Sequence, residues 1–496
     1  MLTRLRVSGF KNLVDVDLRL GPFTCVAGPN GVGKSNLFDA VRFLSLLADR
    51  PLIDAARKVR GGRFAGVASL FHRVGDACRE EMSFEAEMIV PPRGRDDLRQ
   101  EAEATITFLR YSLTLARRPA AERGTLGPLR IVREELRHVN RRDAHKHLLF
   151  KHSAKEWRSS AVAGERRAPF ISTDRRGGEP VVKLHQDGRG SGGPLEYRAA
   201  QLPRTVLSGT NAAESPTALI ARREMQSWRL LQLEPSALRR PDELTAPREL
   251  GSDGSHLAAT LYRLCLSEAR SPHLEQGVYA SVAERLAELV DDVRGVRVDR
   301  DERRALLTLQ VIDRAGTEHP APAISDGSLR FLALAVLELD PENRGLICVE
   351  EPENGVNPER IPAMLKLLKD TAVDVGRPLG RENPLRQVII NTHSPSVVAQ
   401  VPDDSLLVAD WRPGRDEGLG SFHKVGFHPL PGTWRAAVPD SLEPVTLEKL
   451  LAHLNPLAPA SYAAWRPEPR RPRVAGRRVA DREDVQPLLP FGEGSG

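Results

Sequence analysis

Hydrophobic and polar residues alternate at the start of the chain as they do in half-buried strands. The alternation covers residues 2–10 and 14–20, and the continuous apolar run over 23–27 predicts a more buried strand. Beyond Ser35, apolar residues recur at helical spacing. These residues are Leu37, Val41, Leu44 and Ala48. The first fifty residues therefore predict three strands, a turn and a helix.

The pattern changes twice in the middle of the chain. Short alternating runs over 64–135 predict an antiparallel sheet, whereas Arg, His, Gly and Ser dominate 136–215, which we expect to be partly irregular. Good helix formers without interior Gly or Pro then predict helices within 216–295. Two further strands are predicted over 293–300 and 305–313.

The hydrophobic pattern also suggests how the chain is divided into parts. We predict an α/β fold whose first half, residues 1–135, includes the antiparallel subdomain, and whose second half is residues 323–411. A basic, helical and irregular region, 136–322, is inserted between them. Residues 412–496 form a C-terminal extension, and we expect its Pro- and Arg-rich tail beyond residue 465 to be disordered.

Composition narrows the class of protein. A chain of 496 residues exceeds what one hydrophobic core usually supports. Its longest apolar runs, such as 331–339, are about half of a membrane span, and the amino end has no secretory signal, so we expect a cytoplasmic protein without a membrane partner.

Positive charge is unevenly distributed along the chain. The net charge is +6, but residues 117–167 alone hold 14 Lys and Arg against 6 Asp and Glu, and a second basic cluster lies at 466–478. Either segment could contact phosphate backbones, or could be solvated charge on a flexible segment. Both interpretations stay open at this point.

The glycine-rich turn "GPNGVGKSN" matches the pattern of a phosphate-binding loop. Glycines let the backbone wrap around phosphates, successive N–H groups and a helix N-terminus meet their negative charge, and a lysine and a hydroxyl bind the phosphates and Mg²⁺. The predicted nucleotide-binding residues are Gly28, Pro29, Asn30, Gly31, Gly33, Lys34, Ser35 and Asn36. ATP and Mg²⁺ are therefore the expected ligands.

A second group of candidate residues lies about 300 residues later. The apolar strand over 345–349 ends in Glu350, predicted to join Ser35 in holding Mg²⁺, and Glu351, predicted to activate the attacking water. Ser325 lies in a Gly-containing turn that opens a helix. His393 ends another buried strand, and Asn357 lies in a turn between the acidic strand and His393.

This order of motifs resembles the ATPase heads of the ABC superfamily. Within it, the opening strand resembles the branch of RecF, the SMC-type proteins and the OLD-type ATPases, often called AAA-family ATPases. The resemblance covers about 1–110 and 215–411. It places Ser325 and Gly327 on the signature that acts in trans, Asn357 on the D-loop after the acidic strand, and Glu351 and His393 at the catalytic positions.

The resemblance implies a mechanism and an assembly. Two heads would close on two ATP molecules, each held by the phosphate loop of one subunit and the signature of the other, and His393 would sense the γ phosphate. ATP would act as an interfacial ligand whose hydrolysis reopens the homodimer or larger homo-oligomer.

Three departures from the family pattern stand out. Glu350 replaces the usual aspartate, and the signature reads Ser-Asp-Gly-Ser instead of Ser-Gly-Gly-Gln. The glutamine of the glutamine loop cannot be placed, because no Gln in 64–135 has a distinctive setting. We expect neither a fused Toprim nuclease, since only about 85 residues follow Trp411, nor long coiled-coil arms.

Two functional classes follow from the resemblance. The first is the ATPase of a bacterial antiphage defence system that senses or acts on nucleic acid and works with a separately encoded effector, a nuclease. The second is a RecF-like DNA-repair clamp without an effector. We favour the first on family resemblance, and we rank the motor of an ABC transporter last because of the opening strand and the large insertion.

Overall fold

The computed structural model describes most of the chain in two compact units. The described residues are 1–60, 66–118, 127–187, 193–268, 272–416, 418–439, 442–454 and 478–482. The first unit comprises Met1–Arg229, Val373–Gln387 and Leu407–Val445, and the second comprises Leu230–Ala372, Val388–Leu406 and Thr446–Gly496. Most of the tail that was expected to be disordered, and all of its basic cluster except Arg478, lie outside the described residues. The described part, 478–482, is ordered, because Val479 is buried.

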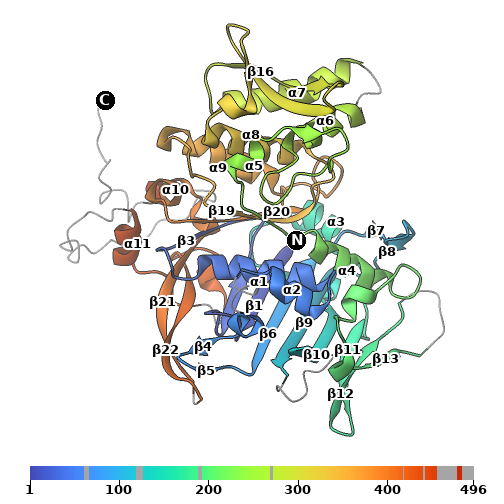
Figure 1. Ribbon diagram of the computed structural model, residues 1–496. Helices are drawn as coiled ribbons and strands as arrows, with labels where there is room; N and C mark the ends of the chain where they lie inside the picture. The colour runs from blue at the N-terminus through green and yellow to red at the C-terminus, as the bar shows by residue number, and fades with distance from the viewer. Residues whose placement is uncertain are drawn as a thin grey trace. The chain divides into compact units, whose positions relative to one another are not determined.

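An eight-stranded antiparallel sheet dominates the first unit (Figure 1). Its order is β13 (Leu195–Arg198), β12 (Glu179–Leu184), β11 (Ile171–Arg176), β10 (Leu129–His138), β9 (Phe108–Arg117), β6 (Glu81–Ile89), β1 (Leu2–Ser8) and β2 (Val16–Arg19). The antiparallel sheet predicted within 64–135 is confirmed by β6, β9 and β10. Part of the stretch expected to be irregular is also ordered, since β11–β13 extend this sheet.

A second sheet in this unit carries the glycine-rich turn. Its strands lie in the order β3 (Phe23–Ala27), β21 (Leu406–Asp416) and β22 (Gly420–Pro429). All five residues of β3 are buried, as its apolar run predicts. Helix α1 (Lys34–Leu47) follows the turn, and the four apolar positions that predicted it, from Leu37 to Ala48, are each at most 2% exposed.

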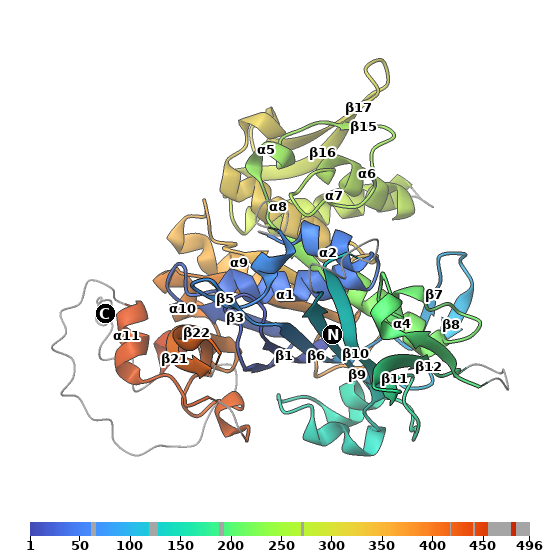
Figure 2. The ribbon, with the colours of Figure 1, turned by 60° about the horizontal axis from the view of Figure 1, so that its bottom comes forward.

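Smaller elements complete the first unit. Figure 2 shows α4 beside β7 and β8, where Ile220 packs against Gly94. These elements are α2 (Leu52–Lys58), β4 (Arg73–Val74), β5 (Ala77–Cys78), β7 (Arg93–Arg95), β8 (Glu101–Glu103), α3 (Ser159–Ala161) and α4 (Pro216–Gln226).

The second unit is α/β as well. Strands β14 (Arg229–Leu231), β19 (Gly345–Glu350) and β20 (Arg386–Thr392) are neighbours in that order, although the first residue of β14 and the first two of β20 belong to the first unit. A separate sheet holds β15 (Asp242–Glu243), β17 (Leu306–Asp313) and β16 (Val293–Asp301), with β18 (Glu318–Pro320) paired to β17. The strands predicted over 293–300 and 305–313 are confirmed as β16 and β17.

Helices cover the sheets of the second unit, and α6 and α7 pack on β16 and β17 (Figure 1). The helices are α5 (Pro235–Leu238), α6 (Leu257–Glu268), α7 (Pro272–Ala287), α8 (Asp326–Leu339), α9 (Ile361–Thr371), α10 (Pro395–Gln400) and α11 (Leu447–Leu454). The predicted α/β fold class with an antiparallel β subdomain is confirmed, and the fold also contains a parallel sheet. Across the described ranges, no helix has both the length and the apolar character needed to cross a membrane.

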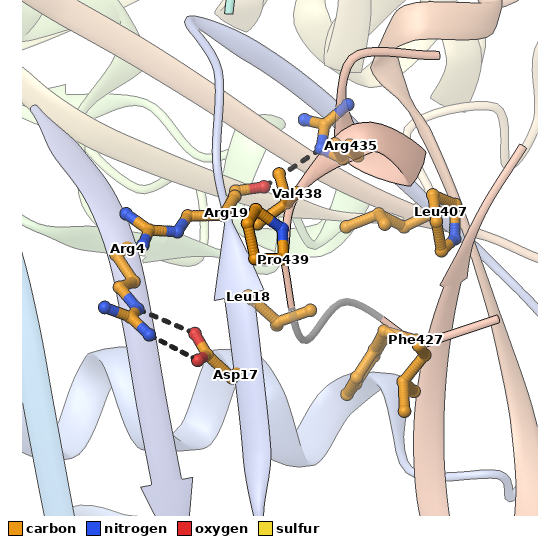
Figure 3. Close-up of a pocket in the computed structure, with 11 residues that line it drawn as sticks. Arg4, Asp17, Leu18, Arg19, Leu407, Phe427, Arg435, Val438 and Pro439 are labelled. Carbon is orange, nitrogen blue, oxygen red and sulfur yellow. Dashed lines mark hydrogen bonds and ion pairs between the residues drawn. The ribbon is translucent and has the colours of Figure 1, made fainter. Parts of the chain in front are cut away.

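The root of the β21–β22 ribbon packs on the edge strand β2. Figure 3 shows Leu407 and Phe427 facing Leu18 across a small pocket. Arg435 closes the pocket and donates from Nε to the Arg19 carbonyl oxygen at 2.9 Å. The two sheets of the first unit are therefore joined at this point by apolar packing and a buried arginine.

Glu134 on β10 is a buried carboxyl that ties the antiparallel sheet to the segment before α4. It accepts hydrogen bonds from the backbone N–H groups of Val206 and Leu207, at 2.8 and 2.9 Å, and from the Tyr111 hydroxyl at 3.2 Å. The neighbouring Thr205 hydroxyl donates to the carbonyl of the last residue of α1 at 2.9 Å. Burial raises the pKa of Glu134 to about 7.

The stability of the protein is therefore expected to fall as the pH rises from about 4.5 to about 7. Over this range the Glu134 carboxyl of the unfolded chain, with its ordinary pKa of 4.5, releases a proton that the folded chain keeps. The difference between the two pKa values corresponds to about 3 kcal/mol. Urea unfolding between pH 4.5 and 8 measures the free energy of unfolding. In the Glu134→Gln variant this free energy should depend less steeply on pH. Equal slopes in the two proteins would contradict the assignment.

Candidate functional site

The glycine-rich turn forms a loop between β3 and α1 in the first unit. Gly31 and Gly33 have φ of +80° and +113°, which L side chains rarely adopt. A Cβ on Gly33 would lie 2.3 Å from the Asn12 amide, and a Cβ on Gly28 would lie 2.7 Å from the Ala409 carbonyl oxygen. The backbone conformation of the loop therefore requires glycine at positions 31 and 33, and the atoms close to the loop require glycine at positions 28 and 33.

The loop presents backbone N–H groups and one buried ammonium. Gly33 is the N-cap of α1 and provides no side-chain hydrogen bond, so no side chain caps this end of the 14-residue helix, where the helix dipole favours an anion. Lys34 is 6% exposed, and its Nζ donates to the carbonyl oxygens of Gly28 and Pro29 at 2.7 and 3.0 Å. Pro29 and Asn30 are exposed, while Ser35 and Asn36 are half-buried. This arrangement fits a polyphosphate.

The residues that follow β1 stabilise the phosphate loop and α1 through hydrogen bonds and an ion pair. Asn12 donates to the Val32 carbonyl at 2.9 Å and accepts from the Asn36 amide at 2.8 Å. Lys11 has a φ of +49°, and its Nζ binds the buried Asp39 of α1 at 2.6 Å. The opening strand and its turn thus brace both the loop and the helix that follows it.

The acidic residues lie in the second unit, where β19 ends. Glu351 follows the strand with a φ of +45°, an uncommon conformation for a residue with a side chain. Its N–H is held by the side-chain oxygen and the carbonyl oxygen of Asn391, at 3.0 and 3.1 Å. Its carboxylate accepts from the Asn354 amide at 2.9 Å. Backbone strain fixed by surrounding hydrogen bonds is typical of functional positions.

The structure brings Glu351 and His393 together. His393 follows β20, the neighbour of β19, and its Nδ1 lies 2.8 Å from Oε1 of Glu351. Both side chains are partly open to solvent, His393 at 43% and Glu351 at 31% exposed. They were predicted from positions 42 residues apart, and they meet because neighbouring strands end at the same edge of a sheet.

The predicted signature also folds as a defined turn. Ser325 is the N-cap of α8, and its Oγ accepts from the Ser328 N–H at 3.2 Å. A Cβ on Gly327 would lie 2.1 Å from the carbonyl oxygen of Gly355, in the turn after Glu351. The glycine at this position therefore permits the signature turn and the acidic turn to pack against each other.

Asn357 lies in the same acidic turn and caps a short helical segment. Its side-chain oxygen accepts from the Glu359 N–H at 3.1 Å. The phosphate loop belongs to the first unit, whereas Ser325, Gly327, Glu350, Glu351, Asn357 and His393 all belong to the second.

Comparison with known protein families shows to which family this chain belongs. The family model AAA_21, described as "AAA domain, putative AbiEii toxin, Type IV TA system", matches residues 23–109 and 206–399, more than half of the chain. This chain belongs to the AAA_21 family. The AAA_21 match is split around an insertion and covers the phosphate loop, the acidic strand and His393, so the chain carries a P-loop ATPase domain.

Shorter stretches of this AAA_21 protein are similar to curated proteins. It is 51% identical to the OLD nuclease of Thermus scotoductus over 41 residues, 8% of each chain. It is 37% identical over 87 residues to the DNA replication and repair protein RecF of Gloeobacter violaceus, covering 17% of this chain and 23% of the relative. A RecF of Paenarthrobacter aurescens matches at 37% over 62 residues, 12% of this chain and 16% of the relative. The matched stretches thus span less than a quarter of each relative.

Solved structures of SMC heads align with the AAA_21 chain at low identity. An SMC head bound to the C-winged helix domain of ScpA aligns with a TM-score of 0.43 at 12% identity, over 86% of this chain and 98% of that chain. The SMC head domain from Thermotoga maritima aligns with a TM-score of 0.34 at 11% identity, over 86% and 99%. The predicted resemblance to the OLD, RecF and SMC group is confirmed at the level of the AAA_21 ATPase domain.

Sequence patterns did not point to two residues that contact the candidate site of this AAA_21 protein. Gln232 comes directly after β14, and its Nε2 donates to Oε2 of Glu350 at 2.6 Å. A glutamine of this kind was expected within residues 64–135, whereas β14 lies beyond the insertion. Its sequence signal is modest: a Gln at the end of a short apolar strand.

Glu353 is a second residue that the sequence did not single out. It is buried, and its Oε1 accepts a hydrogen bond from the Thr392 hydroxyl at 2.5 Å. Burial raises the pKa of Glu353. Thr392 also accepts from the Ser394 N–H at 2.9 Å, so this network holds the backbone on both sides of His393.

Proposed function

We propose that this AAA_21 protein binds and hydrolyses ATP, and that ATP closes two copies of the chain into a dimer that senses or acts on nucleic acid. The observation that carries the proposal is the Glu351–His393 pair at the ends of β19 and β20, in a chain whose phosphate loop has an open helix N-terminus and a buried lysine. A carboxylate beside an imidazole can orient and deprotonate a water molecule.

The phosphate loop provides the binding energy in this mechanism. Its N–H groups and the Lys34 ammonium bind the β and γ phosphates, which hold negative charge that the helix N-terminus also favours. Ser35 and Glu350 supply the hydroxyl and carboxylate oxygens that would hold Mg²⁺, and this ion, when bound, neutralises phosphate charge. In the described residues there is no group of three or more His, Cys, Asp or Glu side chains that could hold a metal ion.

Glu351 and His393 have separate roles in the hydrolysis step of this mechanism. Glu351 accepts the proton of the attacking water. Before ATP arrives, Asn391 holds the backbone N–H of Glu351 and Asn354 holds its carboxylate. His393, held by Glu351, would donate a hydrogen bond to the γ phosphate in this mechanism. The amide of Gln232 on Glu350 would position the carboxylate of the proposed Mg²⁺ ligand in the same way.

The signature turn supports a role in trans. Ser325 lies at the N-terminus of the 14-residue α8, where a phosphate of a second copy could bind. The adjacent Asp326 would repel that phosphate, but Arg239 forms an ion pair with it and also donates to the Ile324 carbonyl at 3.0 Å. Arg239 thus offsets the departure of this signature from the family pattern.

Two biological settings fit such a head. We favour the ATPase of a bacterial antiphage defence system with a separately encoded nuclease, and the stretch similar to the OLD nuclease supports this choice. The alternative, a RecF-like repair clamp without an effector, is supported by the two RecF matches. Both settings require ATP-dependent closure and contact with nucleic acid.

Purification of the native complex from its host separates the two settings. The chain would carry a C-terminal tag at its chromosomal locus, and the proteins that co-purify with and without ATP would be identified. A nuclease recovered in stoichiometric amount supports the defence setting. Recovery without any nuclease, together with ATP-dependent binding to DNA junctions, would support the repair clamp instead.

A basic surface in the first unit is suited to phosphate backbones. The segment 141–161 is folded, because Leu148, Phe150 and Trp157 pack with Phe108 in a hydrophobic cluster. Its cationic side chains lie at the surface above this cluster. They are Arg141, Arg142, Lys146, Lys151 and Lys155. The folded core beneath them favours a fixed cationic surface over a flexible solvated segment.

Neutralising part of this surface should weaken binding to duplex DNA and flatten its salt dependence. For the double variant Arg141→Gln, Arg142→Gln we expect the slope of log K against log salt to fall by about 0.9 for each phosphate that the variant no longer neutralises. Fluorescence anisotropy across a salt series measures the slope, with Arg57→Gln, Lys58→Gln on the exposed end of α2 as the matched control. Unchanged slopes would exclude this surface from DNA binding.

A further inference from the structure

A large aromatic side chain is exposed on β21. Among the residues that the structure describes, four large hydrophobic side chains are exposed, and one of them is aromatic. These four are Leu98, Leu195, Leu266 and Trp411. Trp411 is 43% exposed, whereas aromatic residues such as Phe10, Phe43 and Trp157 fill the cores of the first unit. An indole left in water on a defined strand is a candidate contact for a ligand.

Trp411 lies two residues beyond Ala409, which is the neighbour of the first residue of the phosphate loop. The space beside Gly28, the first residue of the loop, is filled by Ala409, whose carbonyl oxygen would be 2.7 Å from a Cβ at that position. Burial changes at the same point: β21 is buried from Leu406 to Ala409 and more open to solvent beyond. Trp411 follows Ala409 by two residues, roughly 7 Å along the strand, and its side chain is on the same face.

The opposite face of the ribbon is fixed to the first unit. Lys424 pairs with Asp15 at 3.0 Å, and Asp416 pairs with Arg79 at 2.8 Å. The ring of Phe422 lies 4.6 Å from that of His72. At its root the ribbon is held through the face that carries Trp411, by the packing of Leu407 and Phe427 described above (Figure 3). These contacts hold the ribbon against the first unit and so fix the position of the strand that carries Trp411.

The exposed face of the ribbon suits an aromatic, anionic ligand. The exposed residues on this face beyond Ala409 are Trp411, Pro413, Arg415, Ser421 and His423, whereas Val425, opposite Trp411, is buried. The His423 ring stands edge-on to the indole, 6.4 Å between ring centres, and the indole is 43% exposed beside it. Arg415 and His423 are cationic or titratable, and none of the described residues on this face is a carboxylate.

We propose that Trp411 is the stacking platform for the base of the nucleotide whose phosphates the loop holds. The inference rests on the proposed nucleotide binding, and it names the residue that recognises the base. A purine presents a flat π face to any aromatic ring, so stacking contributes to affinity without selecting strongly among purines. The phosphates bind to N–H groups and Lys34, and the base extends to the side of the loop where Ala409 and Trp411 lie.

The test compares ligands with and without a base. For Trp411→Ala, isothermal titration should show an affinity for ATP about tenfold weaker than that of the wild type, while the affinity for inorganic tripolyphosphate stays the same. Trp411→Phe should restore most of the affinity for ATP. Leu98→Ala, which removes another exposed hydrophobic side chain of the first unit, is the matched control, and thermal melting checks that each variant is folded.

Several results would overturn the inference. Unchanged affinity of Trp411→Ala for ATP excludes the stacking role, and an equal loss for ATP and tripolyphosphate means that the substitution damages the loop itself. Weaker binding to single-stranded DNA or weaker self-association, with ATP affinity intact, would instead assign the indole to a strand or to a second copy. The stacking role of Trp411 is also excluded if the wild-type protein binds tripolyphosphate but not ATP. If the wild-type protein binds neither ligand, the proposed ATP binding itself is wrong.

Discussion

Lys34→Ala is expected to raise the Kd for ATP by about 100-fold. The Lys34 ammonium is 6% exposed and donates to two loop carbonyls, so its position is set before a ligand arrives. Charge-assisted hydrogen bonds contribute about 1.5–3 kcal/mol each, and removal of one to two of them gives a change of this size. Isothermal titration with ATP and Mg²⁺ measures the Kd directly.

The control for this experiment is Lys58→Ala, an exposed lysine on α2 of the same unit. It removes one positive charge without touching the loop, so ATP affinity should stay within about twofold of the wild type. The two variants together separate a specific phosphate contact from the general effect of net charge. If Lys34→Ala binds ATP as tightly as the wild type does, the glycine-rich turn is not the phosphate site.

Local sequence patterns predicted the first unit well. The strand β3, the loop and α1 are contiguous, and the spacing of four apolar residues from Leu37 to Ala48 is a property of a single helix. Likewise the alternation that predicted β6 and β9 depends on side chains of one strand facing a core. In such cases the chemistry of neighbours in sequence determines the local structure.

Contacts between distant segments were harder to predict. That Glu351 and His393 belong to one site followed from a family resemblance, and the 2.8 Å contact between them arises because β19 and β20 are neighbours. The contact between Gln232 and Glu350 was not predicted, because nothing in the sequence around Gln232 indicates that β14 lies next to β19. Strand order is a tertiary property, and hydrophobic periodicity does not encode it.

The same limit applies to the ribbon and to the glycines. The alternating residues of β21 and β22 are compatible with any edge hairpin, and only the close approach of Gly28 to Ala409 places Trp411 beside the phosphate loop. The tight approach of Gly327 to Gly355 similarly links two turns that are distant in sequence. A glycine in sequence signals an unusual backbone or a close neighbour, but it does not say which neighbour.

Glu351→Gln is expected to lower the rate of ATP hydrolysis by at least about 100-fold while ATP affinity is kept. General-base catalysis contributes about 10²- to 10⁴-fold, and an amide cannot accept the proton of the attacking water. The glutamine has the size of glutamate and can still contact Asn354 and His393, so the local fold should persist. A phosphate-release assay at saturating ATP measures the rate, and Glu359→Gln, an exposed glutamate in the turn that follows, is the control.

The same variant tests the proposed link between hydrolysis and assembly. If ATP stabilises the closed dimer and hydrolysis reopens it, a protein that binds ATP but cannot hydrolyse it should accumulate as dimers, because only the closed state has the full set of ATP contacts. Light scattering after size exclusion with ATP should then show dimers of Glu351→Gln, and monomers of Lys34→Ala. Hydrolysis at the wild-type rate would remove Glu351 from its assigned role. Slow hydrolysis without dimers would keep the catalytic assignment but reject the ATP sandwich, because the signature of a second copy would then not be needed to hold the nucleotide.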